Sequence, residues 1–225
     1  MSAAAEPAPP SERVRLRRKR ERGSHRREVI DAILDEALIA HLGIVEPDGQ
    51  PIVTPTLHAR DGDLIYCHGA VASRTLRTLE SGAPACLTVS LLDGLVLARS
   101  AMHHSANYRS VMVLGTARAI MDPSEKLAAL RAIIEHIVPG RWEQVREPDE
   151  KELKATAVLA LPIEEASAKI RNGGPADDEE DLALDAWAGT LPLRMRTEPP
   201  TPEPGLRSGI ELPANLSAYR RPGWA

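Results

Sequence analysis

Residues 41–69, HLGIVEPDGQPIVTPTLHARDGDLIYCHG, decide the fold class. The stretch alternates short runs rich in Val, Ile and Thr with two Asp-Gly pairs, Asp48-Gly49 and Asp61-Gly62. An Asp-Gly pair between such runs is a strong hairpin signal, because these residues adopt a positive φ at little cost. We therefore expect three antiparallel strands, over 41–46, 51–59 and 63–68.

The same kind of sequence continues beyond this stretch and is flanked by helix signals. Apolar residues recur at helical spacing in REVIDAILDEALIA over 27–40. Asp122 or Ser124 can cap a second helix, which is expected to run to about Val138 and to stop at Pro139-Gly140. The remaining elements are a short helix over 72–79 and strands over 83–91, 95–98, 108–121, 155–163 and 165–171. Many antiparallel strands with few helices indicate a mainly β barrel or sandwich with peripheral helices.

The composition is that of a globular protein with few aromatic residues. Hydrophobic residues make up 43% of the 225 residues and charged residues 27%, at a net charge of −4. There is no Phe, and aromatic residues total 3%, so the core must be built from Leu, Ile, Val and Ala. We do not expect a base-stacking nucleic-acid surface, because such surfaces need aromatic platforms.

Three regions are expected along the chain. Residues 1–26 begin Pro-rich and continue into the basic stretch RVRLRRKRERGSHRR, and we predict a disordered basic arm. Residues 27–190 form the folded domain. Residues 191–225 form a Pro-rich tail that wraps its own surface or a partner subunit. The basic stretch is interpreted as a solvated segment, a nucleic-acid contact, or an arm that closes over an anionic ligand.

The cysteines and the N-terminus indicate a compartment. Cys67 and Cys86 lie in apolar runs without metal-ligand spacing, which is typical of buried thiols in a reducing cytosol. The N-terminus has no apolar signal region, and no run approaches the roughly 18 apolar residues of a membrane helix. We expect a cytoplasmic protein without membrane contact.

Motifs of several large enzyme classes are absent. The sequence has no G-x-G-x-x-G that opens a helix after a strand, no P-loop, no H-E-x-x-H and no G-x-S-x-G. His58, His68 and the pair His103-His104 are the candidates for metal ligands. Adjacent histidines on a strand point to opposite faces and rarely bind one ion, so we expect no metal site.

The first polar constellation is YCHGAVASR, Tyr66 to Arg74. A strand ends there at a turn of small residues, and a helix begins near Ser73, where free N–H groups attract an anion. His68 adds a polar ring and Arg74 a fork-shaped cation that suits phosphate. The alternative is a plain capped helix, with Ser73 as the cap and Arg74 in solvent.

Two further constellations follow. AMHHSANYRSV, over 101–111, is polar for a stretch that leads into an apolar strand. Polar groups beside a core need partners, which a flavin ring or a self-satisfied loop network would supply. The third joins Lys169 to Trp187, one of only three Trp, which covers a ligand face, a dimer contact or a part of the core.

Together these segments resemble the flavin-nucleotide-binding branch of the pyridoxamine 5′-phosphate oxidase-like proteins, which includes nitroimidazole-resistance proteins. HHSANYRSV and YCHGAxxSR are the more specific motifs. The likeness extends over 30–56, 64–79, 87–117, 152–178 and 186–193.

The resemblance implies a homodimeric split β-barrel with FMN at the subunit interface. The FMN phosphate would lie at the turn of His68, Gly69, Ser73 and Arg74, with help from Arg18 and Lys19. The isoalloxazine edge would run along Val53, Thr54, Pro55 and Thr56. The other cofactor-lining residues would be Ser105, Asn107, Tyr108, Arg109, Ser110, Lys169 and Trp187.

The resemblance also implies a class of activity. We expect an FMN-dependent oxidoreductase that takes electrons from a reduced nicotinamide or a small organic molecule, with His103 or His104 donating a proton near the ring. The end of the chain, NLSAYRRPGWA, lacks the Arg/His-rich signature of authentic pyridoxamine-phosphate oxidases, so vitamin B6 oxidation is not expected. The alternatives are a flavin-binding protein for storage or sensing, and a split barrel that holds haem or a deazaflavin.

Overall fold

The computed structural model describes residues 5–224. The strands are β1 (Gly23–Ser24), β2 (Ile39–Val45), β3 (Pro51–Asp61), β4 (Leu64–Ala70), β5 (Pro84–Leu97), β6 (Ser105–Thr116), β7 (Arg118–Ala119), β8 (Thr156–Pro162), β9 (Glu165–Arg171) and β10 (Gly189–Pro192). The α-helices are α1 (Arg27–Glu36), α2 (Arg74–Glu80), α3 (Pro123–Ile137), α4 (Glu150–Ala155) and α5 (Ala214–Ser217). Short 3₁₀ turns are η1 (Arg20–Arg22), η2 (Ala101–His103), η3 (Trp142–Gln144) and η4 (Glu179–Ala183).

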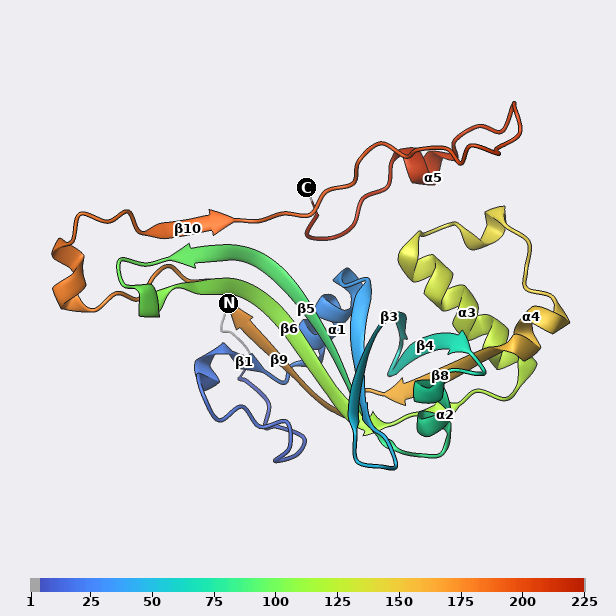
Figure 1. Ribbon diagram of the computed structural model, residues 1–225, viewed down its shortest axis with the longest axis horizontal. Helices are drawn as coiled ribbons and strands as arrows, with labels where there is room; N and C mark the ends of the chain where they lie inside the picture. Colours follow the sequence, from blue (N-terminus) through green and yellow to red (C-terminus); the bar gives the residue numbers. More distant parts are fainter. Residues whose placement is uncertain (1–4, 225) are drawn as a thin grey trace.

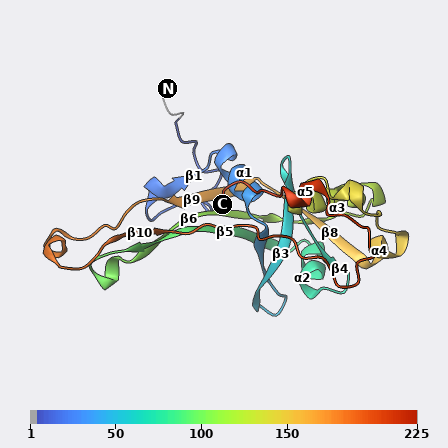
Figure 2. The same cartoon turned by 90° about the horizontal axis from the view of Figure 1, so that it is seen from above.

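The strands form one antiparallel sheet that curls upon itself. Their order is β1-β9-β6-β5-β2-β3-β4-β8-β7, with β10 alongside β5. Figure 1 shows α2, α3 and α4 beside the curled part of the sheet, whereas β5 and β6 run far beyond it. The predicted mainly β fold with peripheral helices is confirmed. The projecting part, residues 90–110 together with 172–192, is called the arm below, and Figure 2 shows its length from above.

The core is aliphatic, as a chain without Phe requires. The largest fully buried side chains include Leu34 of α1, Ile65 of β4 and Leu87 of β5. Each such side chain contributes about 1.5–3 kcal/mol by leaving water. Helix α1 ends at Glu36, four residues before the predicted end, and β2 begins at Ile39. A smaller cluster lies under α3, where Ile133 packs with residues of β4 and β8.

The predicted hairpins at residues 41–69 are confirmed, and their glycines have the conformation that such turns need. Gly49 and Gly62 have φ of 87° and 55°. Strand β3 pairs with β2 through residues 51–57 and with β4 through residues 58–61.

The prediction of two strands around Asp93-Gly94 is wrong. Strand β5 runs unbroken from Pro84 to Leu97, with a register shift between Leu92 and Gly94. The reason is β10, which pairs with this part of β5 and places the Leu191 carbonyl 2.9 Å from where a Cβ of residue 94 would stand. The glycine therefore allows a close approach between strands instead of a turn.

Both ends of the described chain pack against the domain. Val14 is 1% exposed, Arg13 pairs with Glu165, and β1 pairs with β9, so the expected disorder of residues 1–26 is not seen over 11–24. The prediction for residues 1–4 lies outside the described residues. The tail pairs with its own β5 through β10 and then returns to the ends of α1 and α3, where Arg221 is buried. Of the helices in residues 5–224, none is long and apolar enough to cross a membrane.

Candidate functional site

The first group of predicted site residues meets where β3 passes α2. The hydroxyls of Thr54 and Thr75 lie 3.4 Å apart, and Val53, Thr54 and Pro55 are exposed. This half of β3 pairs with β2 on one edge, and no other strand of residues 5–224 pairs with its opposite edge. Backbone N–H and C=O groups along such an edge are available to hydrogen-bond a flat polar molecule.

The turn before α2 combines a confirmed cap with an exposed cation. Ser73 is the cap, and its hydroxyl accepts a hydrogen bond of 3.5 Å from the Leu76 amide. Gly69 allows β4 to approach α2, because a Cβ there would stand 2.9 Å from a methyl of Leu76. The Arg74 side chain is 71% exposed, with its Nε 3.6 Å from the Glu46 carboxylate. Arg74 is therefore free to turn towards an anion, and the phosphate role stays a prediction.

His68 is the polar group of this region that lacks a partner. Its Nδ1 is buried without a hydrogen-bond partner among residues 5–224. Burial lowers the pKa of its imidazole, so the ring is neutral at physiological pH. A buried nitrogen without a partner is rare in proteins and is a place where a ligand atom would fit.

The second group lies on the arm and is largely satisfied internally. Arg109 pairs with Glu36 and with Asp93. Asn107 accepts a hydrogen bond of 2.5 Å from Arg171, and Ser110 donates one of 3.3 Å to the Lys169 carbonyl. Asn107, Arg109 and Ser110 thus have protein partners, as the alternative of a self-satisfied loop network predicts. Of the other two predicted residues, Ser105 is exposed and Tyr108 is half-buried.

The two adjacent histidines have different surroundings. His103, at the end of η2, has a buried Nδ1 with no partner in the described chain, and its Nε2 lies 3.7 Å from Asp178. His104 is exposed, and its Nδ1 lies 3.0 Å from the Ser100 carbonyl. Trp187 is 70% exposed, and its ring stands over Gly189. These three residues lie on the arm, away from β3.

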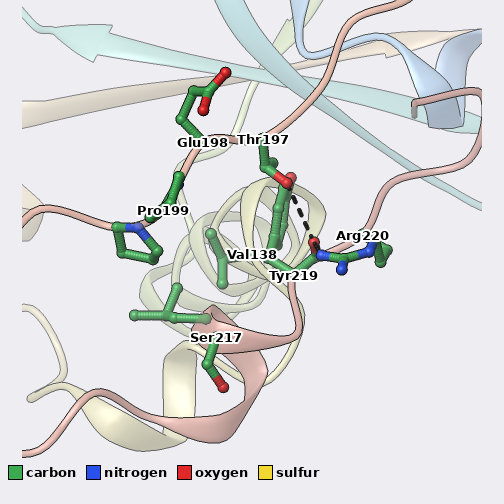
Figure 3. Close-up of a pocket in the computed structure, with 9 residues that line it drawn as sticks. Val138, Thr197, Glu198, Pro199, Ser217, Tyr219 and Arg220 are labelled. Atoms are coloured by element: carbon green, nitrogen blue, oxygen red, sulfur yellow. Dashed lines mark hydrogen bonds between the residues drawn. The ribbon is translucent and has the colours of Figure 1, made fainter.

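One protomer therefore presents the predicted residues as two separate groups. In the sheet order, β5 and β2 lie between β6 and β3. The loop that carries Arg18 and Lys19 leads into η1, which packs beside β9, whereas α2 packs against β2, β7 and β8. A cavity of about 350 Å³ between the tail and α3 contains none of the predicted residues (Figure 3). Sequence reasoning also missed Glu36 and Asp93, whose contact with Arg109 joins distant parts of the chain.

The comparisons with known proteins identify the family. The family model described as pyridoxamine 5′-phosphate oxidase matches residues 26–170. The flavocytochrome Anf3 from Azotobacter vinelandii is 44% identical, with a TM-score of 0.90, and the match covers 96% of this chain and 100% of that one. Comparison with curated protein sequences gives no match.

Two further solved structures are similar. The FAD and heme binding protein from Mycobacterium smegmatis is 38% identical, with a TM-score of 0.83, over 87% of this chain and 95% of that one. A putative 5-nitroimidazole antibiotic resistance protein from Bacteroides thetaiotaomicron is 23% identical over 66% of this chain and 86% of that one, with a TM-score of 0.57, which supports the fold alone. The chain belongs to the pyridoxamine 5′-phosphate oxidase-like split-barrel family.

Proposed function

We propose that this protein is a homodimeric, flavin-dependent oxidoreductase whose flavin lies along the open edge of β3. The observation that carries the proposal is that edge, with exposed Val53 to Pro55 beside the Thr54–Thr75 contact and a partnerless nitrogen on His68. The two relatives above 35% identity, described as a flavocytochrome and as an FAD and heme binding protein, support a flavin. When bound, a flavin supplies hydride and single-electron transfer.

The residues present fit such a ligand. The unpaired edge of β3 offers backbone donors and acceptors to a ring edged with carbonyls and nitrogens. At the turn that ends in Ser73, the exposed Arg74 would supply the positive charge for a phosphate. FMN is our predicted flavin. The dinucleotide FAD, named for the Mycobacterium smegmatis relative, is the competing form.

A second copy of the chain would complete the site. The arm leaves the body of its own protomer (Figure 1). Several of its apolar side chains are exposed. These are Leu92, Leu95, Met102, Leu182, Leu184, Trp187 and Leu191. Exposed apolar side chains gathered on one projection mark an interaction surface. A partner's arm over β3 would bring Ser105, Tyr108 and Trp187 to the flavin, with His103 or His104 as the proton donor. Lys169, which pairs with Ser110 at the base of the arm, would approach from beside it.

Haem is a second candidate, favoured by one observation. His68 and His103 each carry a buried Nδ1 that lacks a partner within residues 5–224. Either histidine, as a neutral imidazole, would be a suitable ligand for haem iron. Two relatives are described as a flavocytochrome and as an FAD and heme binding protein. In the alternative of flavin storage or sensing without catalysis, neither His103 nor His104 would need to act as a proton donor.

The test is the visible spectrum of the purified protein, before and after FMN or FAD is added and the excess is removed. We expect retained flavin bands, with the nucleotide identified by chromatography after denaturation. A sharp band near about 400 nm would indicate haem. Light scattering gives the oligomeric state. A monomer that retains neither chromophore would contradict the proposal, whereas bound flavin without reduction by any nicotinamide would favour storage or sensing.

A further inference from the structure

Arg221, in the Pro-rich tail, closes the ends of two helices that lie far from it in sequence. Its guanidinium is buried, with only 7% of the residue exposed. Nε donates to the Glu36 carbonyl at 2.6 Å, and Nη1 donates to the His136 carbonyl at 2.6 Å. Nη2 donates to the Asp35 carbonyl at 2.8 Å. The last carbonyls of a helix lack partners and carry partial negative charge, so one cation satisfies α1 and α3 together.

Other residues of the tail also contact the C-terminal ends of α1 and α3. The Tyr219 hydroxyl donates to the Ile137 carbonyl at 2.8 Å, and Asn215 donates to the Pro139 carbonyl at 2.9 Å. Gly223 has a φ of 78°, and a Cβ there would stand 2.0 Å from a carboxylate oxygen of Glu36. Figure 3 shows Tyr219 and Arg220 beside Thr197, over the end of α3. Residues 215–224 are called the C-terminal latch below.

His136 lies between a cation and a carbonyl that favour opposite protonation states of its Nε2. Its Nε2 lies 2.8 Å from Nη2 of Arg221 and 2.8 Å from the Ala37 carbonyl. A neutral imidazole nitrogen either accepts or donates, and the accepting form bonds the guanidinium. A protonated His136 can donate to the Ala37 carbonyl, but it can no longer accept from Arg221. It would also place a positive charge beside the guanidinium in a poorly solvated site.

Other charged groups around His136 do not relieve this conflict. Arg60 and His58 approach from β3, Asp35 from α1 and Arg221 from the latch. The Asp35 carboxylate accepts two hydrogen bonds from Arg60, of 2.8 and 2.6 Å. The His58 ring lies 5.2 Å from the His136 ring, and its Nδ1 has no partner in the described chain. Burial is the main cause that lowers the pKa of both histidines, to about 4 for His58.

We propose that the C-terminal latch is acid-sensitive: neutral His136 lets Arg221 close on the ends of α1 and α3, and protonation of His136 releases it. This inference does not depend on a flavin. Release would uncover Glu36, the residue that holds Arg109 at the base of the arm. Opening of the latch would thereby change the surroundings of Arg109 in β6, the strand that carries several of the predicted cofactor residues.

The test is hydrogen–deuterium exchange on the full chain at about pH 7.5 and about pH 5.5, corrected for the intrinsic pH dependence of exchange. We expect the protection of 214–224 and 136–140 to fall about tenfold at the lower pH, while β8 remains protected. His136→Gln, which stays neutral, should remove most of that difference. His104→Gln, a matched change at an exposed histidine on the arm, should leave it intact.

Each outcome bears on the proposal. Equal protection of the latch at both pH values in the natural sequence would overturn it, as would an unchanged pH difference in His136→Gln. Arg221→Gln should open the latch at both pH values without unfolding the barrel, which circular dichroism checks. If Arg221→Gln does not fold, the comparison of His136→Gln with His104→Gln still decides.

Discussion

Arg109 of β6 and Glu36 at the end of α1 form a two-pronged ion pair inside the domain. Arg109 Nη2 donates to Glu36 at 2.8 Å, Nη1 contacts the other carboxylate oxygen, and a second pair joins Arg109 to Asp93. The hydrogen bonds to Glu36 and then to Asp93 raise the pKa of Arg109, which remains charged at any physiological pH. The pair ties the base of the arm to the first helix.

Replacing Glu36 by Gln should therefore destabilise the fold. The change leaves the Arg109 charge partly unpaired in a mostly buried site, and we expect a loss of about 3 kcal/mol in the free energy of unfolding, measured by chemical denaturation. Arg196→Gln, which breaks an exposed pair with Glu198, is the control and should change it by less than about 1 kcal/mol. Equal effects of the two changes would show that the pair does not hold the arm.

Gly94→Ala should detach β10 from β5. The added Cβ would stand 2.9 Å from the Leu191 carbonyl, a backbone atom that cannot move without the strand. We expect faster amide exchange over 189–192 and a destabilisation of about 1–3 kcal/mol. Gly173→Ala is the matched control, because its Cβ meets no atom within 4 Å. Unchanged exchange in Gly94→Ala would contradict the close approach.

Stability should fall with acid through His58 as well as His136. The folded pKa of His58 is lowered to about 4 from an ordinary value of 6.5. A neutral buried histidine favours folding above the unfolded pKa, so this contribution is complete above about pH 6.5 and is lost as the pH falls towards 4. We expect roughly 2–3 kcal/mol less stability at about pH 4.5 than at pH 7.

The control for this pH dependence is His58→Gln, compared with His104→Gln. Denaturant titrations at both pH values should give a smaller pH difference for His58→Gln than for the natural sequence. His104 is exposed, so its replacement should leave the difference unchanged. If His58→Gln retains the full acid loss, another group is responsible.

The phosphate prediction can be tested by two arginines on one helix. Arg74 at the start of α2 is expected to contact the flavin phosphate, whereas Arg77 lies one turn later. Arg74→Gln should weaken flavin binding about tenfold, measured by fluorescence titration, because one charge-assisted hydrogen bond is lost. Arg77→Gln should bind as the natural sequence does. If the two variants bind equally, Arg74 is a solvent-exposed residue of a plain capped helix.

The sequence predicts the local parts of this fold well, and it fails where distant segments decide. The Asp-Gly pairs at 48–49 and 61–62 form turns between strands that pair with each other. The same pair at 93–94 does not turn, since β10, almost a hundred residues later, pairs with that stretch. The Ser73 cap is found from its neighbours, whereas the partners of Arg109 carry no sequence signal.

The difference between local signals and contacts of distant segments also explains why the predicted site residues lie in two separate groups. Residues that lie close in sequence, such as Val53 to Thr56 or Gly69 to Arg74, are exposed or half-buried, and their roles stay predictions. Whether they meet Tyr108 and Trp187 depends on an arm that points away from its own protomer. No pattern in the sequence predicts how the residues of the arm would contact those of β3.

The position of Arg221 has a consequence for the order in which the chain folds. The hydrogen bond from Arg221 to Glu36 spans 185 residues, so it closes a loop that includes the barrel and the arm. The entropy lost on closing a loop grows with its length, and a preformed barrel shortens the effective span. Refolding should thus have two kinetic phases, a barrel phase and a slower docking phase, and Trp224, three residues from Arg221, is placed to report the second.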